Sequence, residues 1–221
     1  MDADSTDQPR PKPGVRFTFL DILTGSDLSR RRLPLMIATG KEPGPTVWIT
    51  ACGHGDEVGG MVIIQEVFKR LRRRPLLRGA LFAFPLMNPI GFETASRNIT
   101  LTEEDLNRCF PGDPTGSLGQ RIAHRIFSRI METGPSLVLD LHNDWIRSIP
   151  YTLLDPYPGR HQRNAHDMAR HFSRLTGFPV ITDVEEVHSS LSCSLIRRNV
   201  PALTLELGES YVVNEIQTER G

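Results

Sequence analysis

Residues 51–60 read ACGHGDEVGG and place His54 and Glu57 three positions apart, between an apolar run and a helical pattern. A tight turn or a first helical turn brings two side chains at this spacing to one side. Glycines at 53 and 55 give the backbone freedom to aim both side chains at one point. The same glycines suggest a loop that binds the phosphates of a nucleotide. The stretch therefore predicts either a metal site or a nucleotide site.

The nucleotide alternative fails on the positions of the glycines. A Gly-x-Gly-x-x-Gly fingerprint that begins at residue 53 needs glycine at position 58, where the chain has Val58. Glu57 would also face the pyrophosphate with a charge of the same sign. A Walker loop is excluded, because Gly-Lys-Ser/Thr occurs nowhere in the chain.

A third candidate metal ligand, His142, follows the apolar run of SLVLDLHND. A solitary histidine at a strand end is more often an ordinary polar residue than a ligand. If His142 lies at the same sheet edge as His54 and Glu57, a role as a metal ligand becomes the better interpretation. Two histidines, one glutamate and an open position form a catalytic zinc site. We therefore predict one Zn²⁺ per chain, held by His54, Glu57 and His142.

Two further segments bring polar groups towards this edge. Glu206 interrupts the apolar run LTLELG, where an ionised carboxylate is costly without a cation or a catalytic role. The long loop at 87–116 carries Arg97 and the Asn107-Arg108 pair of DLNR. Arg97 alone is typical of a solvated arginine, whereas a guanidinium in DLNR is suited to binding a carboxylate through two parallel hydrogen bonds.

These residues must be positioned by alternating strands and helices. Apolar runs typical of strands lie at 15–23, 33–40, 46–52, 80–86, 136–142, 150–154, 179–183 and 202–208, and helical patterns at 57–73, 118–133 and 161–177. The alternation predicts a three-layer α/β/α domain with a largely parallel central sheet, mixed at its N-terminal edge. Function in such sheets gathers at the carboxyl ends of the strands.

The composition is typical of a globular protein with one domain. The 221 residues are 38% hydrophobic, and 26 basic residues balance 26 acidic ones, so no net charge indicates a nucleic-acid or membrane partner. No apolar run approaches the roughly 18–20 residues of a membrane helix. Three cysteines without paired spacing favour the cytoplasm over a disulfide scaffold. We expect a disordered tail at 1–14 and a catalytic domain at 15–221.

Taken together, the motifs resemble those of the succinylglutamate desuccinylase/aspartoacylase family of zinc hydrolases, relatives of the carboxypeptidase A-type metallopeptidases. The matching stretches are GHGDE (53–57), NPIGF…R (88–97), DLNRCFPG (105–112), DLH (140–142) and LTLELG (203–208), in the family's order. The resemblance implies a zinc-carboxypeptidase-like fold and gives each candidate a role. His54, Glu57 and His142 would bind zinc, Glu206 would be the acid–base, Arg97 would polarise the scissile carbonyl, and Asn107 with Arg108 would hold a substrate carboxylate.

Two departures from the family pattern refine this expectation. Asp56 stands where the two enzymes that name the family have asparagine, which points to branches similar to deacetylases of N-acetyl-diaminobutyrate-type substrates. Only 13 residues follow Gly208, whereas family members usually continue into a C-terminal β-rich domain. The chain is thus expected to be a minimal or C-terminally shortened member.

The expected activity is zinc-dependent removal of an acyl group from a small N-acyl amino acid or related amine by metal-activated water. The substrate would carry a carboxylate, and the oligomeric state, including a homo-oligomer, is left open by these residues. Two alternatives remain. One is a metallocarboxypeptidase that acts on short peptides, and the other is a non-catalytic relative that binds a small acid.

Overall fold

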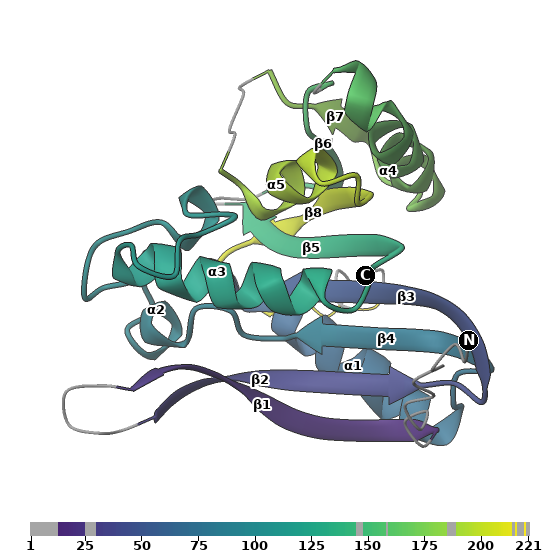
Figure 1. Cartoon of the computed structure of the whole chain (residues 1–221), viewed down its shortest axis with the longest axis horizontal. Coiled ribbons are helices and arrows are strands. Elements are labelled where there is room, and N and C mark those ends of the chain that lie inside the picture. The colour runs from purple at the N-terminus through teal and green to yellow at the C-terminus, as the bar shows by residue number, and fades with distance from the viewer. Residues whose placement is uncertain are drawn as a thin grey trace, which may run out of the picture.

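The computed structural model describes residues 13–24, 30–144, 148–157, 159–184, 189–213, 215 and 219. Residues 1–12 of the tail predicted at 1–14 lie outside the described residues. The predicted end of the tail is one residue too late, because the first strand begins at Gly14. The strands are β1 (Gly14–Thr24), β2 (Arg30–Thr39), β3 (Glu42–Ala51), β4 (Arg78–Phe84), β5 (Leu137–Asp144), β6 (Tyr151–Leu154), β7 (Val180–Thr182) and β8 (Ala202–Glu209). They form one eight-stranded sheet in the order β1-β2-β4-β3-β5-β8-β6-β7 (Figure 1).

The centre of the sheet is parallel and both sides carry antiparallel pairs. β4, β3, β5 and β8 pair in parallel. The β1–β2 hairpin joins β4 in antiparallel orientation, as expected for the N-terminal edge. On the other side β6 runs antiparallel to β8, and β7 pairs in parallel with β6. The predicted α/β fold with a mixed sheet is confirmed, and the second antiparallel junction is an addition to it.

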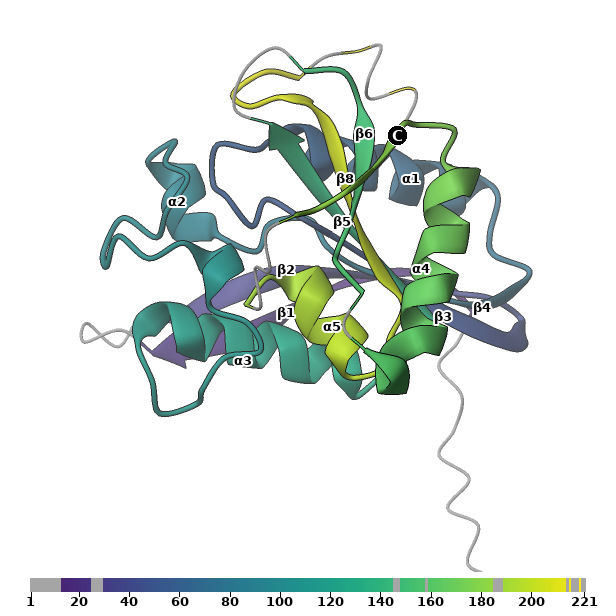
Figure 2. The same ribbon diagram turned by 90° about the horizontal axis from the view of Figure 1, so that it is seen from above.

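Helices cover both faces of the sheet. They are α1 (Gly59–Arg73), α2 (Pro89–Glu93), α3 (Leu118–Met131), α4 (Arg163–Leu175) and α5 (Leu191–Arg197), with short 3₁₀ turns η1 (Leu106–Arg108) and η2 (Arg160–Gln162). Figures 1 and 2 show α1 on one side of the strands and α3 and α5 on the other. Among the described residues, no helix combines the length and the hydropathy needed to cross a lipid bilayer.

Alternation along the strands produces two cores and decides where the polar residues point. On β8, Leu203 and Leu205 pack with Ile64 of α1 in one core, whereas Ala202 packs with α5 in the other. Successive strand residues face opposite sides, so Glu206 lies on the face that α3 and α5 cover. The predicted orientation of Glu206, opposite to its neighbouring leucines, agrees with this arrangement.

Helix α5 was not predicted. It has seven residues, and Leu191 to Ile196 are all buried, so this part of the helix has no solvent-exposed face. A short helix that is buried all round lacks the apolar–polar periodicity from which helices are predicted. Its N-terminus is capped by Ser190, whose hydroxyl accepts a hydrogen bond from the Cys193 N–H at 3.1 Å.

Candidate metal centre and pocket

The turn between β3 and α1 carries two of the candidate ligands. The Glu57 N–H donates to the His54 carbonyl at 3.2 Å, which closes the turn and brings both side chains to one side. A Cβ at Gly55 would overlap the backbone of Gly91 and Phe92 at α2. Glycine is therefore required at this position by the close approach of α2, and not only by backbone freedom.

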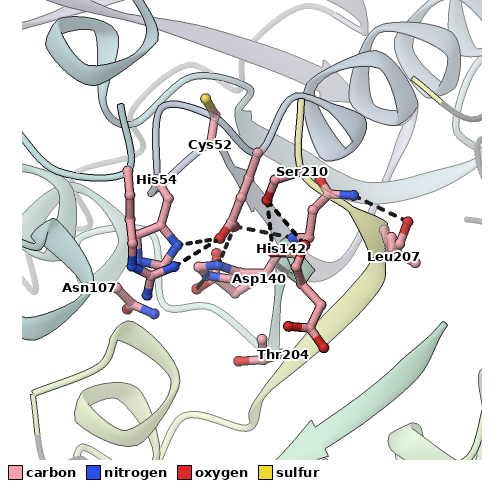
Figure 3. Close-up of polar contacts among 12 residues, drawn as sticks. Cys52, His54, Asn107, Asp140, His142, Thr204, Leu207 and Ser210 are labelled. Carbon is pink, nitrogen blue, oxygen red and sulfur yellow. Dashed lines mark hydrogen bonds and ion pairs between the residues drawn. The ribbon is translucent and has the colours of Figure 1, made fainter. Parts of the chain in front are cut away.

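His54, Glu57 and His142 form one buried cluster, with 3%, 2% and 2% of their surfaces exposed. The His54 Nδ1 lies 2.6 Å from Glu57 Oε1, and the His142 Nδ1 lies 2.7 Å from Glu57 Oε2. One ligand atom from each residue falls within 4.8 Å of the others, so the three groups are close enough together that they could hold one ion. Figure 3 shows His54 and His142 approaching the cluster from two different segments.

Both imidazoles are held from behind by carboxylates that the sequence analysis did not single out. The His54 Nε2 lies 3.0 Å from Asp105 Oδ1, and the His142 Nε2 lies 3.0 Å from Asp140 Oδ2. The Thr50 hydroxyl in turn donates to Asp140 at 2.6 Å. Carboxylates on the outer nitrogen fix the ring and leave Nδ1 to the metal. Asp105 is the first residue of the motif DLNR, and Asp140 is the first residue of the motif DLH. These two motifs were the signal in the sequence from which both acids could have been identified.

Electrostatics of the cluster also fit a cation. Each ring contacts carboxylates at both nitrogens, and only the doubly protonated form has two N–H groups to donate. Burial opposes the charge on His142, but Asp140 and Glu57 outweigh it and raise its pKa well above the usual range. Burial likewise opposes the charge on Glu57, but the two histidines lower its pKa to about 2. The carboxylates of Glu57, Asp105 and Asp140 thus stabilise positive charge at the place where a metal would lie.

Glu206 lies beside this cluster. It is paired in register with His142 across the parallel strands β5 and β8. Its Oε2 is shielded from solvent and has no hydrogen-bond partner among the described residues. Burial raises the pKa of Glu206 to about 7; His142 opposes the rise, and Glu57 and Asp144 add to it. A carboxyl group with such a pKa can exchange protons near neutral pH.

The three residues predicted from the long loop lie at the mouth of the cluster. Arg97 is about half exposed, with Nη1 3.4 Å from Glu57 Oε1 and Nη2 3.3 Å from Asp105 Oδ2. The Asn107 side-chain oxygen accepts a hydrogen bond from the Leu191 N–H at 3.0 Å, and so ties η1 to α5. The Arg108 guanidinium donates to the Asn107 carbonyl at 3.0 Å.

A pocket of about 110 Å³ joins these groups. Five of the seven predicted site residues line it, and Glu57 and His142 lie buried behind it. The lining residues are His54, Arg97, Asn107, Arg108, Leu153, Asp155, Asp183, Ser190, Ser192, Thr204 and Glu206. The structure thus gathers all seven residues. It adds pocket residues from β6, α5 and β8, and from the positions that flank β6, β7 and α5, which were not predicted from the sequence.

The family of this chain follows from its match to a known family model. Residues 43–221 match the family model described as the succinylglutamate desuccinylase/aspartoacylase catalytic domain. The chain belongs to this family. The expectation drawn from the motifs is therefore confirmed.

Individual relatives of the family differ in how much they share with the chain. It is 33% identical over 149 residues to the N-alpha-acetyl-L-2,4-diaminobutyric acid deacetylase of Halomonas elongata, and the match covers 62% of the chain and 43% of that relative. A succinylglutamate desuccinylase/aspartoacylase structure from Rhodobacter sphaeroides superposes with a TM-score of 0.81 at 25% identity, over 95% of the chain and 63% of that structure. The chain thus spans less than two thirds of each relative's length.

Two further structures share the fold. The product-bound ectoine utilization protein EutE (DoeB) of Ruegeria pomeroyi has a TM-score of 0.84 at 22% identity, over 97% of the chain and 66% of that protein. A metallo-carboxypeptidase of Burkholderia cenocepacia has a TM-score of 0.70 at 18% identity, over 94% of the chain and 61% of that protein. The predicted metallocarboxypeptidase-like architecture is confirmed by these neighbours. The buried cluster of His54, Glu57 and His142 is a set of side chains that could hold a metal ion.

Proposed function

We propose that the chain is a zinc-dependent amidohydrolase that removes an acyl group from a small N-acyl amino acid or related amine. The observation that carries the proposal is the register pair of His142 and Glu206, which sets a buried carboxyl group beside a cluster able to bind a metal. The name of the Halomonas relative, a deacetylase of an N-acetylated amino acid, supports the reaction class.

The residues of the cluster fit zinc. Two imidazole Nδ1 atoms and one carboxylate, with carboxylates behind both rings, form a donor set of the kind that holds catalytic zinc with an open position. Zinc bound there would polarise the acyl carbonyl and make water acidic enough to lose a proton near neutral pH. We assign one zinc ion per chain to His54, Glu57 and His142.

The other residues have separate tasks in the proposed reaction. Glu206 accepts a proton from the attacking water at its unpartnered Oε2 and passes it to the leaving nitrogen, so that the C–N bond breaks to a carboxylate and a free amine. The Arg97 guanidinium stabilises the negative charge that develops on the acyl oxygen. Arg108 binds the substrate carboxylate, with Asn107 beside it, and so orients the amide.

The proposal extends to the setting of the enzyme. We place the start of the catalytic domain at Gly14, where β1 begins, one residue before the boundary predicted from the sequence, and the protein in the cytoplasm. The thiols of Cys52 and Cys109, which form no disulfide in the described part of the chain, support a reducing compartment. The partner is a small molecule, with no nucleic acid or membrane involved.

A substrate panel tests the function. The chain loaded with zinc to one ion per molecule is incubated with N-acyl amino acids and with dipeptides, and the released acids and amines are quantified. Acyl release without release of the C-terminal residue of dipeptides is the expected result. Release from dipeptides alone would establish the carboxypeptidase alternative, and no turnover at full zinc occupancy would favour a binding protein.

A further inference from the structure

The pocket beside the metal cluster has an acidic wall that the proposed reaction does not use. Asp155 directly follows β6 and Asp183 directly follows β7, and both line the pocket. The Asp183 N–H donates to the Leu154 carbonyl at 2.9 Å, which fixes the ends of the two parallel strands side by side. Two carboxyl groups therefore face the same pocket as Arg97 and Arg108, from different elements.

Three buried hydroxyl groups line the same pocket as Asp155, and one of them contacts its carboxyl group. Ser190, Ser192 and Thr204 are 8%, 3% and 7% exposed, and all three line the pocket. The Ser192 hydroxyl oxygen lies 3.4 Å from the hydroxyl oxygens of both Ser190 and Thr204, and Ser192 also bonds to the Asp155 carboxyl group. Figure 3 shows that Thr204 lies on the side of the cluster that faces α5.

The Asp155 carboxyl group is not fully satisfied by these neighbours. Its Oδ2 is shielded from solvent and has no hydrogen-bond partner among the described residues. Burial raises the pKa of Asp155 to about 6; the bond from Ser192 opposes the rise, and the charges of Asp183 and Asp140 add to it. A carboxylate in this position is costly without a cation. A positively charged group that entered the pocket would remove that cost.

We propose that Asp155 is a specificity-determining residue that binds the free ammonium group of a diamino substrate whose other nitrogen is acylated. This inference rests on the proposed function. The substrate class is an N-acylated diamino acid, whose carboxylate meets Arg108 and whose ammonium group meets Asp155, with Asp183 adding negative charge. The pocket thus matches a zwitterion, with opposite charges on different walls.

The test compares two substrates that differ only in the charged group. Nα-acetyl-2,4-diaminobutyrate and N-acetylnorvaline have side chains of equal length that end in an ammonium and a methyl group. The zinc-loaded parent chain should prefer the first by at least about tenfold in kcat/KM. Asp155→Asn should lower kcat/KM for the first at least about tenfold more than for the second, and Asp155→Glu should restore part of the preference.

Asp167→Asn is the matched control, because Asp167 lies on an exposed side of α4 and pairs there with Arg163 and Arg170. The Asp167→Asn variant should prefer Nα-acetyl-2,4-diaminobutyrate over N-acetylnorvaline by the same factor as the parent. A parent that hydrolyses both substrates equally, or an Asp155→Asn variant that loses both activities equally, would overturn the assignment of Asp155 and leave the amidohydrolase intact.

Binding measurements decide the assignment if no amide is hydrolysed, in which case the proposed function itself fails. Calorimetry of the zinc-loaded parent should then show free 2,4-diaminobutyrate binding at least about tenfold more tightly than norvaline. This comparison needs no variant, so it also applies if Asp155→Asn does not fold. Equal affinities would overturn the inference.

Discussion

His142 and Glu206 are register partners on the adjacent parallel strands β5 and β8. Neighbouring strands lie about 4.8 Å apart, and partnered side chains leave the sheet on the same face. A metal ligand and a proton-transfer group on such a pair are held by the backbone of the sheet itself. The distance between them therefore does not depend on the conformation of a loop. Such a fixed distance gives the precise positioning that catalysis needs.

Glu206→Gln should fold and bind zinc as the parent does but lose at least about a hundredfold in kcat, because a positioned acid–base typically contributes about 10²–10⁴ in rate. Glu209→Gln is the matched control. Glu209 lies at the end of the same strand, and its register partner is Asp144 and not a metal ligand. It should stay within about a few-fold of the parent. The reverse ranking on zinc-replete protein would show that the wrong carboxylate is assigned.

His142→Ala should lose most of the bound zinc while the domain remains folded. The substitution removes one Nδ1 donor and leaves Asp140 and Glu57 without their shared partner. Metal analysis after gel filtration, together with circular dichroism, measures both properties. His171→Ala, on the exposed side of α4, should retain one zinc per chain. Full occupancy in the His142 variant contradicts the ligand assignment.

The stabilisation of the fold by zinc should increase with pH. In the metal-free chain the pKa of His142 is raised in the folded state, so its stabilising effect is present below about 6.5 and is lost as the pH rises through the raised value. The pKa of Glu57 is lowered to about 2, so its contribution is present above 4.5 and is lost only on acidification towards 2. Zinc requires the deprotonated imidazoles and therefore binds more tightly as the protons leave.

Thermal unfolding with zinc and with a chelator, between about pH 6 and pH 8, measures this dependence. The difference in Tm should widen as the pH rises. Calorimetry in buffers of different ionisation enthalpy should show the release of about one to two protons per zinc, because two Nδ1 positions exchange a proton for the metal. A constant Tm difference without proton release would contradict the participation of both rings.

Arg108→Lys should raise KM strongly for substrates that carry a carboxylate, because an ammonium group cannot reproduce the planar guanidinium fork. Steady-state kinetics of the parent on N-acyl amino acids and on the corresponding decarboxylated amides provide the control. Equal turnover of the amides by the parent would mean that Arg108 does not bind a carboxylate.

The parts of the structure that follow from local pattern were predictable from the sequence. Trp48 on β3 and Leu203 on β8 lie in apolar runs that read as buried strands, and His54 and His142 follow such runs, so their placement at one sheet edge could be inferred. Asp155 was beyond reach, because its position depends on β6 pairing in antiparallel orientation with β8. That pairing is a contact between segments about 50 residues apart, and neither segment encodes it alone.

Gly55 has a further consequence for substrate binding. Since a side chain there would overlap Gly91 and Phe92, the turn that carries His54 and Glu57 lies directly against α2, from which the chain runs on to Arg97. The metal-binding turn and α2 cannot shift independently of each other. One wall of the pocket is thus ordered when the chain folds. Ligand binding therefore does not have to be accompanied by a further loss of conformational entropy in this wall.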